Sequence, residues 1–99
     1  MLTLPIRKKW FDMIRMGEKK EEYREIKTYY RKRFQTIGLL DRNGLPTTHE
    51  ERIAFRNGYS AKSPQIEATV NLDIKKGKEE WGALPNVEYY VLRIVKIHI

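Results

Sequence analysis

The chain has 99 residues and no cysteine, which predicts one domain over residues 1–99 and excludes disulfides, thiolate metal sites and cysteine nucleophiles. A third of the residues are charged and the net charge is +7, a balance that favours polyanionic partners such as nucleic acid. No segment approaches the roughly 20 apolar residues of a membrane-spanning helix and no signal peptide is visible, so we expect a cytoplasmic protein without a membrane partner.

The first predicted elements are a short strand and a helix. Leu2 and Leu4 alternate around Thr3 as in a strand. Pro5 suits the first position of a helix, where its missing N–H leaves nothing unsatisfied. Apolar residues at helical spacing then predict a helix from about residue 6 to residue 16, with Gly17 as its C-cap. The apolar positions of this helix are Ile6, Trp10, Met13 and Ile14.

The next segments are rich in charge. The charges of residues 19–26 fit a solvated helix or a strand, and we favour a strand because Gly17 indicates a break before them. Residues 28–35, with their tyrosines and arginines, predict a second short helix. A loop is expected over residues 41–46, where aspartate, asparagine, glycine and proline gather.

The second half of the chain reads as strands. Alternation predicts strands over residues 52–56 and 66–75, separated by a turn at Asn57-Gly58 and a loop over residues 60–64. A connector with a helical turn near residues 78–81 follows. The last stretch, residues 87–99, is apolar on both parities, which predicts a strand buried on both faces. The order predicts an α+β fold whose sheet is closed or nearly closed.

One short motif resembles a known family. The segment GEKKEEYR has glycine, lysine, an acidic or hydroxyl residue and arginine at the spacing typical of ASCH domains. The preceding helix and the strand-rich second half are also similar to that family. The motif positions are Gly17, Lys19, Glu22 and Arg24.

The resemblance implies a PUA-like, mostly antiparallel mixed β-barrel with two or three short helices and a cleft beside the motif. It also implies RNA binding, since ASCH domains are widely suspected of it. One small bacterial member is an acetylcytidine amidohydrolase in which the motif lysine is catalytic, and another member resembles a ribonuclease. In the amidohydrolase a threonine stands where this chain has Glu22, and this departure argues against an identical deacetylation mechanism.

The motif residues also suggest a site on chemical grounds. Arginine presents a planar fork that matches phosphate or carboxylate, whereas lysine is a point charge whose pKa falls when it is desolvated. Glu22 and Arg24 are two apart and share one face of a strand. In an enzyme, Lys19 would stabilise negative charge, Glu22 would act as general base, and Glu67 on the later strand would complete an acid–base set. The alternative is an ion-pair network at the surface.

Other residues are candidates for contacts with nucleic acid. The segment TYYRKRF, residues 28–34, interleaves aromatic rings with cations, as single-strand binders do. The alternative is an amphipathic helix in which the rings of this segment pack inward and its cations face solvent. Tyr89 or Tyr90 is a further candidate for stacking, with core packing the expected role of Tyr90. The nucleic-acid-binding candidates are Lys19, Arg24, Tyr30, Arg31, Arg33, Arg56 and Tyr59.

No cofactor or metal is expected. The two histidines, His49 and His98, lack metal-ligand spacing, and no phosphate-binding glycine loop is present. The sequence therefore predicts an RNA- or nucleotide-binding domain with a basic cleft. A small hydrolase acting on a modified nucleoside or on RNA is the alternative, and a plain interaction protein is a third possibility.

Overall fold

Five strands, two α-helices and one 3₁₀ turn make up the fold over the residues that the structure describes. The computed structural model describes residues 1–98. In chain order the elements are β1 (Thr3–Pro5), α1 (Lys8–Arg15), β2 (Glu21–Arg24), α2 (Thr28–Thr36), β3 (Glu51–Arg56), β4 (Gln65–Lys76), η1 (Glu79–Trp81) and β5 (Glu88–His98).

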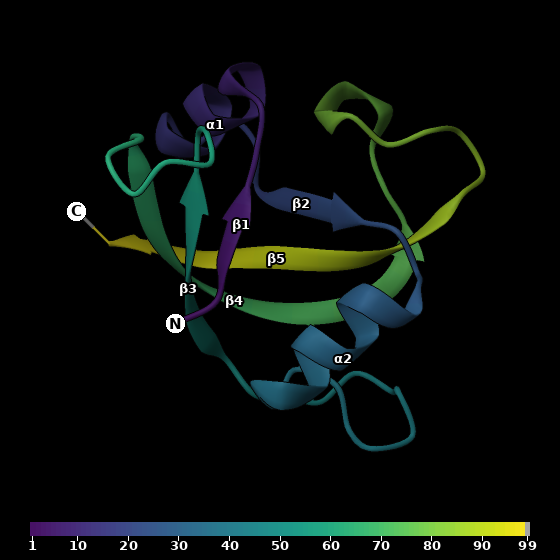
Figure 1. Ribbon diagram of the computed structural model, residues 1–99. Helices are drawn as coiled ribbons and strands as arrows, with labels where there is room; N and C mark the ends of the chain where they lie inside the picture. The colour runs from purple at the N-terminus through teal and green to yellow at the C-terminus, as the bar shows by residue number, and fades with distance from the viewer. Residues whose placement is uncertain (99) are drawn as a thin grey trace.

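The strands form a single sheet in the order β1-β3-β4-β5-β2. The β1–β3 pair is parallel and the other three pairs are antiparallel. The sheet curls into a half-barrel, with α1 and α2 towards opposite ends of it (Figure 1). A mixed, mostly antiparallel α+β fold is therefore confirmed. Within residues 1–98, β1 and β2 are the end strands and do not pair with each other, so hydrogen bonding leaves the sheet open.

The helix α1 differs from its prediction at its start. Pro5 does not begin the helix, because it ends β1 and aligns with Arg56 of β3. A proline is tolerated there because β1 is an edge strand. The cap prediction is confirmed, since Gly17 follows the helix with a φ of +80°. The buried face consists of Phe11 and Ile14, while Trp10 is only half-buried.

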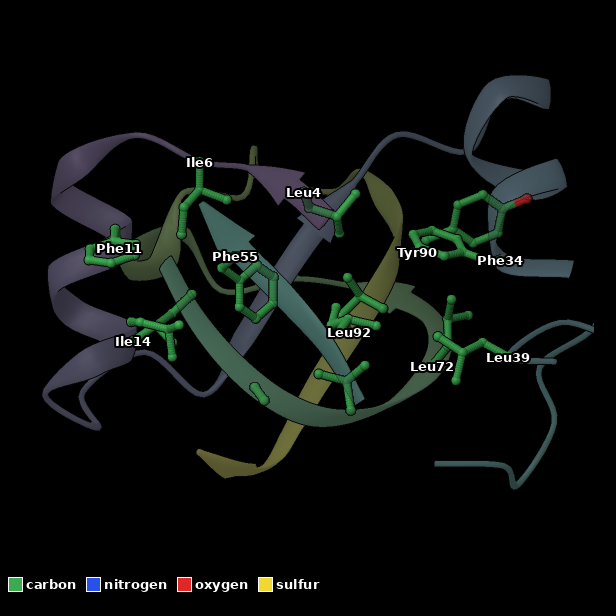
Figure 2. Packing of buried hydrophobic residues seen from close by; sticks show 14 of the residues in the cluster. Leu4, Ile6, Phe11, Ile14, Phe34, Leu39, Phe55, Leu72, Tyr90 and Leu92 are labelled. Atoms are coloured by element: carbon green, nitrogen blue, oxygen red, sulfur yellow. The ribbon is translucent and has the colours of Figure 1, made fainter. Parts of the chain in front are cut away.

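The core fills the inside of the curl. Figure 2 shows Phe11 and Ile14 of α1 at one end of the cluster, and Phe34 of α2 beside Tyr90 at the other end. The predicted alternation of β4 is confirmed, because its apolar positions from Ile66 onward face this core. Its buried members are Ile66, Ala68, Val70 and Leu72. Burial of each large apolar side chain stabilises the folded protein by about 1.5–3 kcal/mol. Because the buried residues come from both helices and the sheet, the core fixes how the helices pack on the sheet.

The strand β5 is buried on both faces only in its first half. Residues 89–92 are all buried, as the apolar run predicts. Further along, Lys96 aligns with Thr69 and Ile94 with Val70, which leaves Val95 as an extra residue in a bulge. Val95 is 52 % exposed, so full burial of this half was a wrong prediction. Ile99 lies outside the described residues.

Candidate functional site

The motif residues lie on and just before β2. This strand pairs with β5, and Glu22 and Arg24 align with Leu92 and Tyr90 of that strand. Side chains two apart in a strand point to the same face. Glu22 and Arg24 therefore sit together over the part of β5 that is buried on both faces, and both are largely removed from solvent.

The Glu22 carboxylate lies between two cations. Its Oε2 accepts a hydrogen bond from the Arg24 guanidinium at 2.7 Å, and its Oε1 lies 3.3 Å from Lys19 Nζ. Breaking such a buried pair by removing one partner commonly costs about 3–5 kcal/mol, because the remaining charge has no compensation. The local charge is +1, from two cations and one anion.

Lys19 is the most deeply buried charged residue of the site, with 1 % of its surface exposed. Its Nζ donates to the Trp81 carbonyl and lies 4.8 Å from the ring centres of both Trp10 and Tyr23. Burial lowers the pKa of Lys19, and the neighbouring Glu22 carboxylate opposes this shift. The structure therefore encloses the amine between aromatic rings and the η1 carbonyl.

Arg24 connects three parts of the chain. Besides Glu22, its guanidinium donates to the Pro5 carbonyl at 2.8 Å and to the Tyr30 hydroxyl at 3.3 Å. Burial opposes the charged form of Arg24, but the Glu22 carboxylate and the contact with Tyr30 outweigh it and raise the pKa of the guanidinium. Arg24 Nε is buried and has no hydrogen-bond partner within residues 1–98.

A pocket of about 300 Å³ opens above this pair. Four aromatic residues contribute to it, and five charged residues place three cations and two carboxylates around it. Its walls come from the β1–α1 segment, α1, β2, the start of α2, and β5. The lining residues are Pro5, Ile6, Arg7, Trp10, Glu22, Tyr23, Arg24, Glu25, Lys27, Tyr30 and Tyr89.

A second set of contacts supports β2 from its other face. Lys75 Nζ lies 2.9 Å from Glu21 Oε2, and the Tyr23 hydroxyl donates to Glu21 Oε1 at 2.8 Å. Burial alone would raise the pKa of Glu21, but the hydrogen bonds from Lys75 and Tyr23 outweigh it and lower this pKa. The backbone N–H of Lys78 donates to the Tyr23 hydroxyl at 2.9 Å, so β2 is also tied to the β4–β5 connector.

The predicted site residues are only partly brought together. Glu22, Arg24 and Tyr30 line the pocket, and Lys19 lies behind it in contact with Glu22. Glu67 does not line it; this residue pairs with Arg52 at 2.8 Å. Glu67 and Arg52 project from the neighbouring strands β4 and β3 at partly exposed positions, so their ion pair lies at the surface and away from the pocket.

The remaining predicted residues lie outside this pocket. Arg56 donates to the Gln65 side chain, across the β3–β4 pair. Arg31 and Arg33 are exposed on α2, and the Arg33 guanidinium lies 4.5 Å from the Tyr29 ring centre. Tyr59 is 90 % exposed and lines a different hollow.

Several lining residues were not predicted as site residues. Trp10 was assigned to the apolar face of the helix, but it is half-buried and turned to the pocket. Arg7, Glu25 and Lys27 also line the pocket, and their only sequence signal was proximity to the motif or to the ends of the helices. Tyr89 was one of two stacking candidates; it lines the pocket, while Tyr90 is confirmed as a core residue.

No family model, curated protein or solved structure matches the chain. Among residues 1–98, no group of three or more histidine, cysteine, aspartate or glutamate side chains is placed to hold a metal ion. In the same residues, neither helix has the length and apolar character needed to cross a membrane.

Proposed function

We propose that the chain binds single-stranded RNA or a nucleotide and receives one unpaired base in the pocket between α1, β2 and α2. The observation that carries this proposal is an aromatic-walled pocket with a carboxylate and a guanidinium side by side on one wall. Nucleobases present flat faces that stack on aromatic rings and edges that carry hydrogen-bond donors and acceptors. The pocket offers both kinds of contact.

The pocket favours a small, flat ligand. Its volume of about 300 Å³ is at the lower end of the range for small-molecule sites. The Glu22 carboxylate can accept hydrogen bonds from the N–H groups of a base, and the Arg24 guanidinium, which also lines the pocket, can donate to a carbonyl or ring nitrogen.

Charge supports a phosphate-bearing ligand over a neutral one. The whole chain carries +7, and Arg7 and Lys27 are exposed cations on the lining of the pocket. Exposed cations attract a phosphate chain from a distance and add a salt-dependent share of affinity. A base in the pocket places its own phosphate near these side chains.

We further propose that the half-barrel is a PUA-like domain of the ASCH type. The motif supports this assignment, because its lysine, glutamate and arginine form one contact network rather than three separate surface charges. The curled sheet with a helix at each end is compatible with a small barrel-like fold.

The test is a titration of labelled single-stranded RNA and of the same RNA in a duplex, each at low and at moderate salt. We expect tighter binding of the single strand and a steep loss of affinity with salt. Arg24→Lys keeps the charge but loses the planar fork, so it should weaken binding about tenfold. Arg15→Lys is the matched control, because Arg15 is exposed at the end of α1. Equal binding of single strand and duplex, or an unaffected Arg24→Lys protein, would reject the proposal.

A hydrolase is the second candidate, and the buried Lys19–Glu22 pair favours it. Desolvation lowers the pKa of Lys19, as for many catalytic lysines. Lys19 is 1 % exposed, so the groups that enclose the amine have to move before a substrate reaches it. Incubation with acetylcytidine and with RNA tests this function. Turnover that Lys19→Met abolishes would establish it, and the absence of turnover would leave binding as the function.

A further inference from the structure

A second hollow adjoins the pocket at one segment of chain. It has a volume of about 380 Å³, and residues 5–7 line both hollows. The two hollows therefore share one three-residue segment of their lining. Groups bound in the two hollows would be neighbours along a chain-like ligand. The residues that line the second hollow are Pro5, Ile6, Arg7, Asn57, Gly58 and Tyr59.

The turn that forms the second hollow is fixed in place. The Asn57 side-chain amide donates to the Ile6 carbonyl at 3.1 Å, and the Asn57 backbone N–H donates to the Pro64 carbonyl at 2.9 Å. Gly58 has a φ of +127°, and a Cβ there would lie 2.5 Å from Ser63 Oγ. Both the conformation and the close approach require glycine. The turn is thus anchored to the same segment that lines the first pocket.

Within residues 1–98, two side chains of this hollow have no partner. Tyr59 is 90 % exposed and pairs with no other ring within residues 1–98. Arg7 is exposed at the start of α1, and within the same residues its side chain makes no salt bridge. Arg7 lines both hollows, so a free cation stands between two places that offer aromatic surface.

We propose that the second hollow is a subsite for the neighbouring nucleotide of a single strand. The base next to the one in the first pocket stacks on the Tyr59 ring, and Arg7 contacts the phosphate that links the two nucleosides. Stacking on aromatic rings and cation contacts with phosphate are the usual combination for single-strand binding. This inference rests on the proposed function and makes the minimal ligand a dinucleotide rather than a free nucleotide.

The experiment compares adenosine with the dinucleoside monophosphate ApA, and cytidine with CpC, by NMR titration of the intact chain. Each dinucleoside adds one phosphate and a second nucleoside, which consists of a base and its ribose. We expect the dinucleoside to bind about tenfold more tightly than the nucleoside, as stacking of one further base commonly provides. Tyr59→Ala should remove most of this gain and leave nucleoside binding unchanged. Arg7 lines both hollows, so Arg7→Met should weaken binding of the dinucleoside more than binding of the nucleoside.

Two variants serve as controls. Tyr59→Phe keeps the ring and should keep the gain, and Tyr29→Ala removes an exposed tyrosine that lines neither hollow. A nucleoside that binds while the dinucleoside gains nothing, or a gain that survives Tyr59→Ala, would overturn the subsite and leave the proposed function intact. If neither ligand shifts resonances of residues that line the first pocket, the proposed function fails and the subsite fails with it.

Discussion

The Arg24 guanidinium donates to the Pro5 carbonyl at 2.8 Å, and this bond joins the two end strands of the sheet. Arg24 is the last residue of β2, and Pro5 is the last residue of β1. Backbone hydrogen bonds do not join these strands within residues 1–98. A side chain therefore links the two edges of the half-barrel, at the same place where Glu22 and Tyr30 contact Arg24.

Arg24→Met should destabilise the protein and loosen β1 in particular. The substitution removes the donor to Pro5 and leaves Glu22 with Lys19 as its only cation, so we expect a loss of about 2–3 kcal/mol. The Ile6 N–H, which donates to the Arg56 carbonyl at 2.8 Å, should exchange faster with solvent. Urea unfolding and amide hydrogen exchange measure the two effects.

The control for this prediction is Arg15→Met. Arg15 has 63 % of its side chain exposed and lies 3.8 Å from Asp12. Exposed pairs of this kind contribute little, so the control should stay within about 0.5 kcal/mol of the unaltered protein. A loss in Arg24→Met that is no larger than in the control would show that the link between β2 and β1 does not support the fold.

Glu21 should contribute to the loss of stability in acid. Its pKa lies below the ordinary value of 4.5 in the folded protein, because contacts with Lys75 and Tyr23 outweigh burial. A group with a depressed folded pKa stabilises the protein above its unfolded value and loses that contribution as the pH falls through its folded value. Glu21→Gln should therefore lower stability at neutral pH and make the decline below pH 4.5 less steep.

Unfolding free energies from neutral to strongly acidic pH test this expectation. Glu18→Gln is the comparison, because Glu18 is an exposed glutamate just before the same strand. The Glu21→Gln curve should lie below that of the unaltered protein at neutral pH and converge with it at low pH. The Glu18→Gln curve should follow that of the unaltered protein throughout. An acid decline that keeps its full steepness in Glu21→Gln would contradict the assigned role of Glu21.

Gly82→Ala should displace Trp10 from its place beside the pocket. Gly82 has a φ of +99°, and a Cβ there would lie 2.9 Å from the Trp10 ring. Gly17 has a φ of +80° with nothing within 4 Å, so Gly17→Ala carries the conformational cost alone, about 1–2 kcal/mol. We expect Gly82→Ala to lower the free energy of unfolding more than Gly17→Ala does, and to change the tryptophan fluorescence, which Gly17→Ala should leave unchanged. Equal losses and equal spectra would mean that Trp10 moves aside without cost.

The sequence predicted most of the fold because its signals were local. Strict alternation located β4, and the aromatic and basic run located α2 within one residue. The start of α1 was predicted wrongly because Pro5 is equally compatible with a helix start and with the end of an edge strand. The choice between them depends on pairing with β3, which is a contact between residues about 50 positions apart.

The candidate site could be predicted only in part for a similar reason. The spacing of Glu22 and Arg24 was enough to place them on one face of a strand. Burial of Lys19 was not predictable, because lysine is almost never fully buried unless it is paired. Its enclosure depends on Trp81, 62 positions away, and Tyr89 reaches the pocket only because β5 lies beside β2.

Glu22→Gln should cost more stability than Lys19→Met, and the two losses should not add. Removing the Glu22 charge leaves two buried cations without their anion, for an expected loss of about 3 kcal/mol. Lys19→Met keeps the Glu22–Arg24 pair and should cost less. In the double variant Arg24 is the only remaining cation without its anion, so its loss should be smaller than the sum by about 0.5–3 kcal/mol.

The dependence on pH separates electrostatics from packing in this pair. The pKa of Lys19 is below 10.5 in the folded protein, and removal of the Glu22 carboxylate should lower it further. A depressed lysine pKa means that the folded protein gains stability relative to the unfolded chain as the pH rises towards 10.5, because the buried amine loses its proton first. The stability deficit of Glu22→Gln should therefore shrink in alkali, and this shrinkage should disappear in the Lys19→Met background.

Glu25→Gln is the matched control, since Glu25 has 75 % of its side chain exposed and lies 3.7 Å from Lys27. A deficit that stays constant with pH in both backgrounds would mean that the role of Glu22 is packing, and that the buried charges of Lys19 and Arg24 do not depend on it.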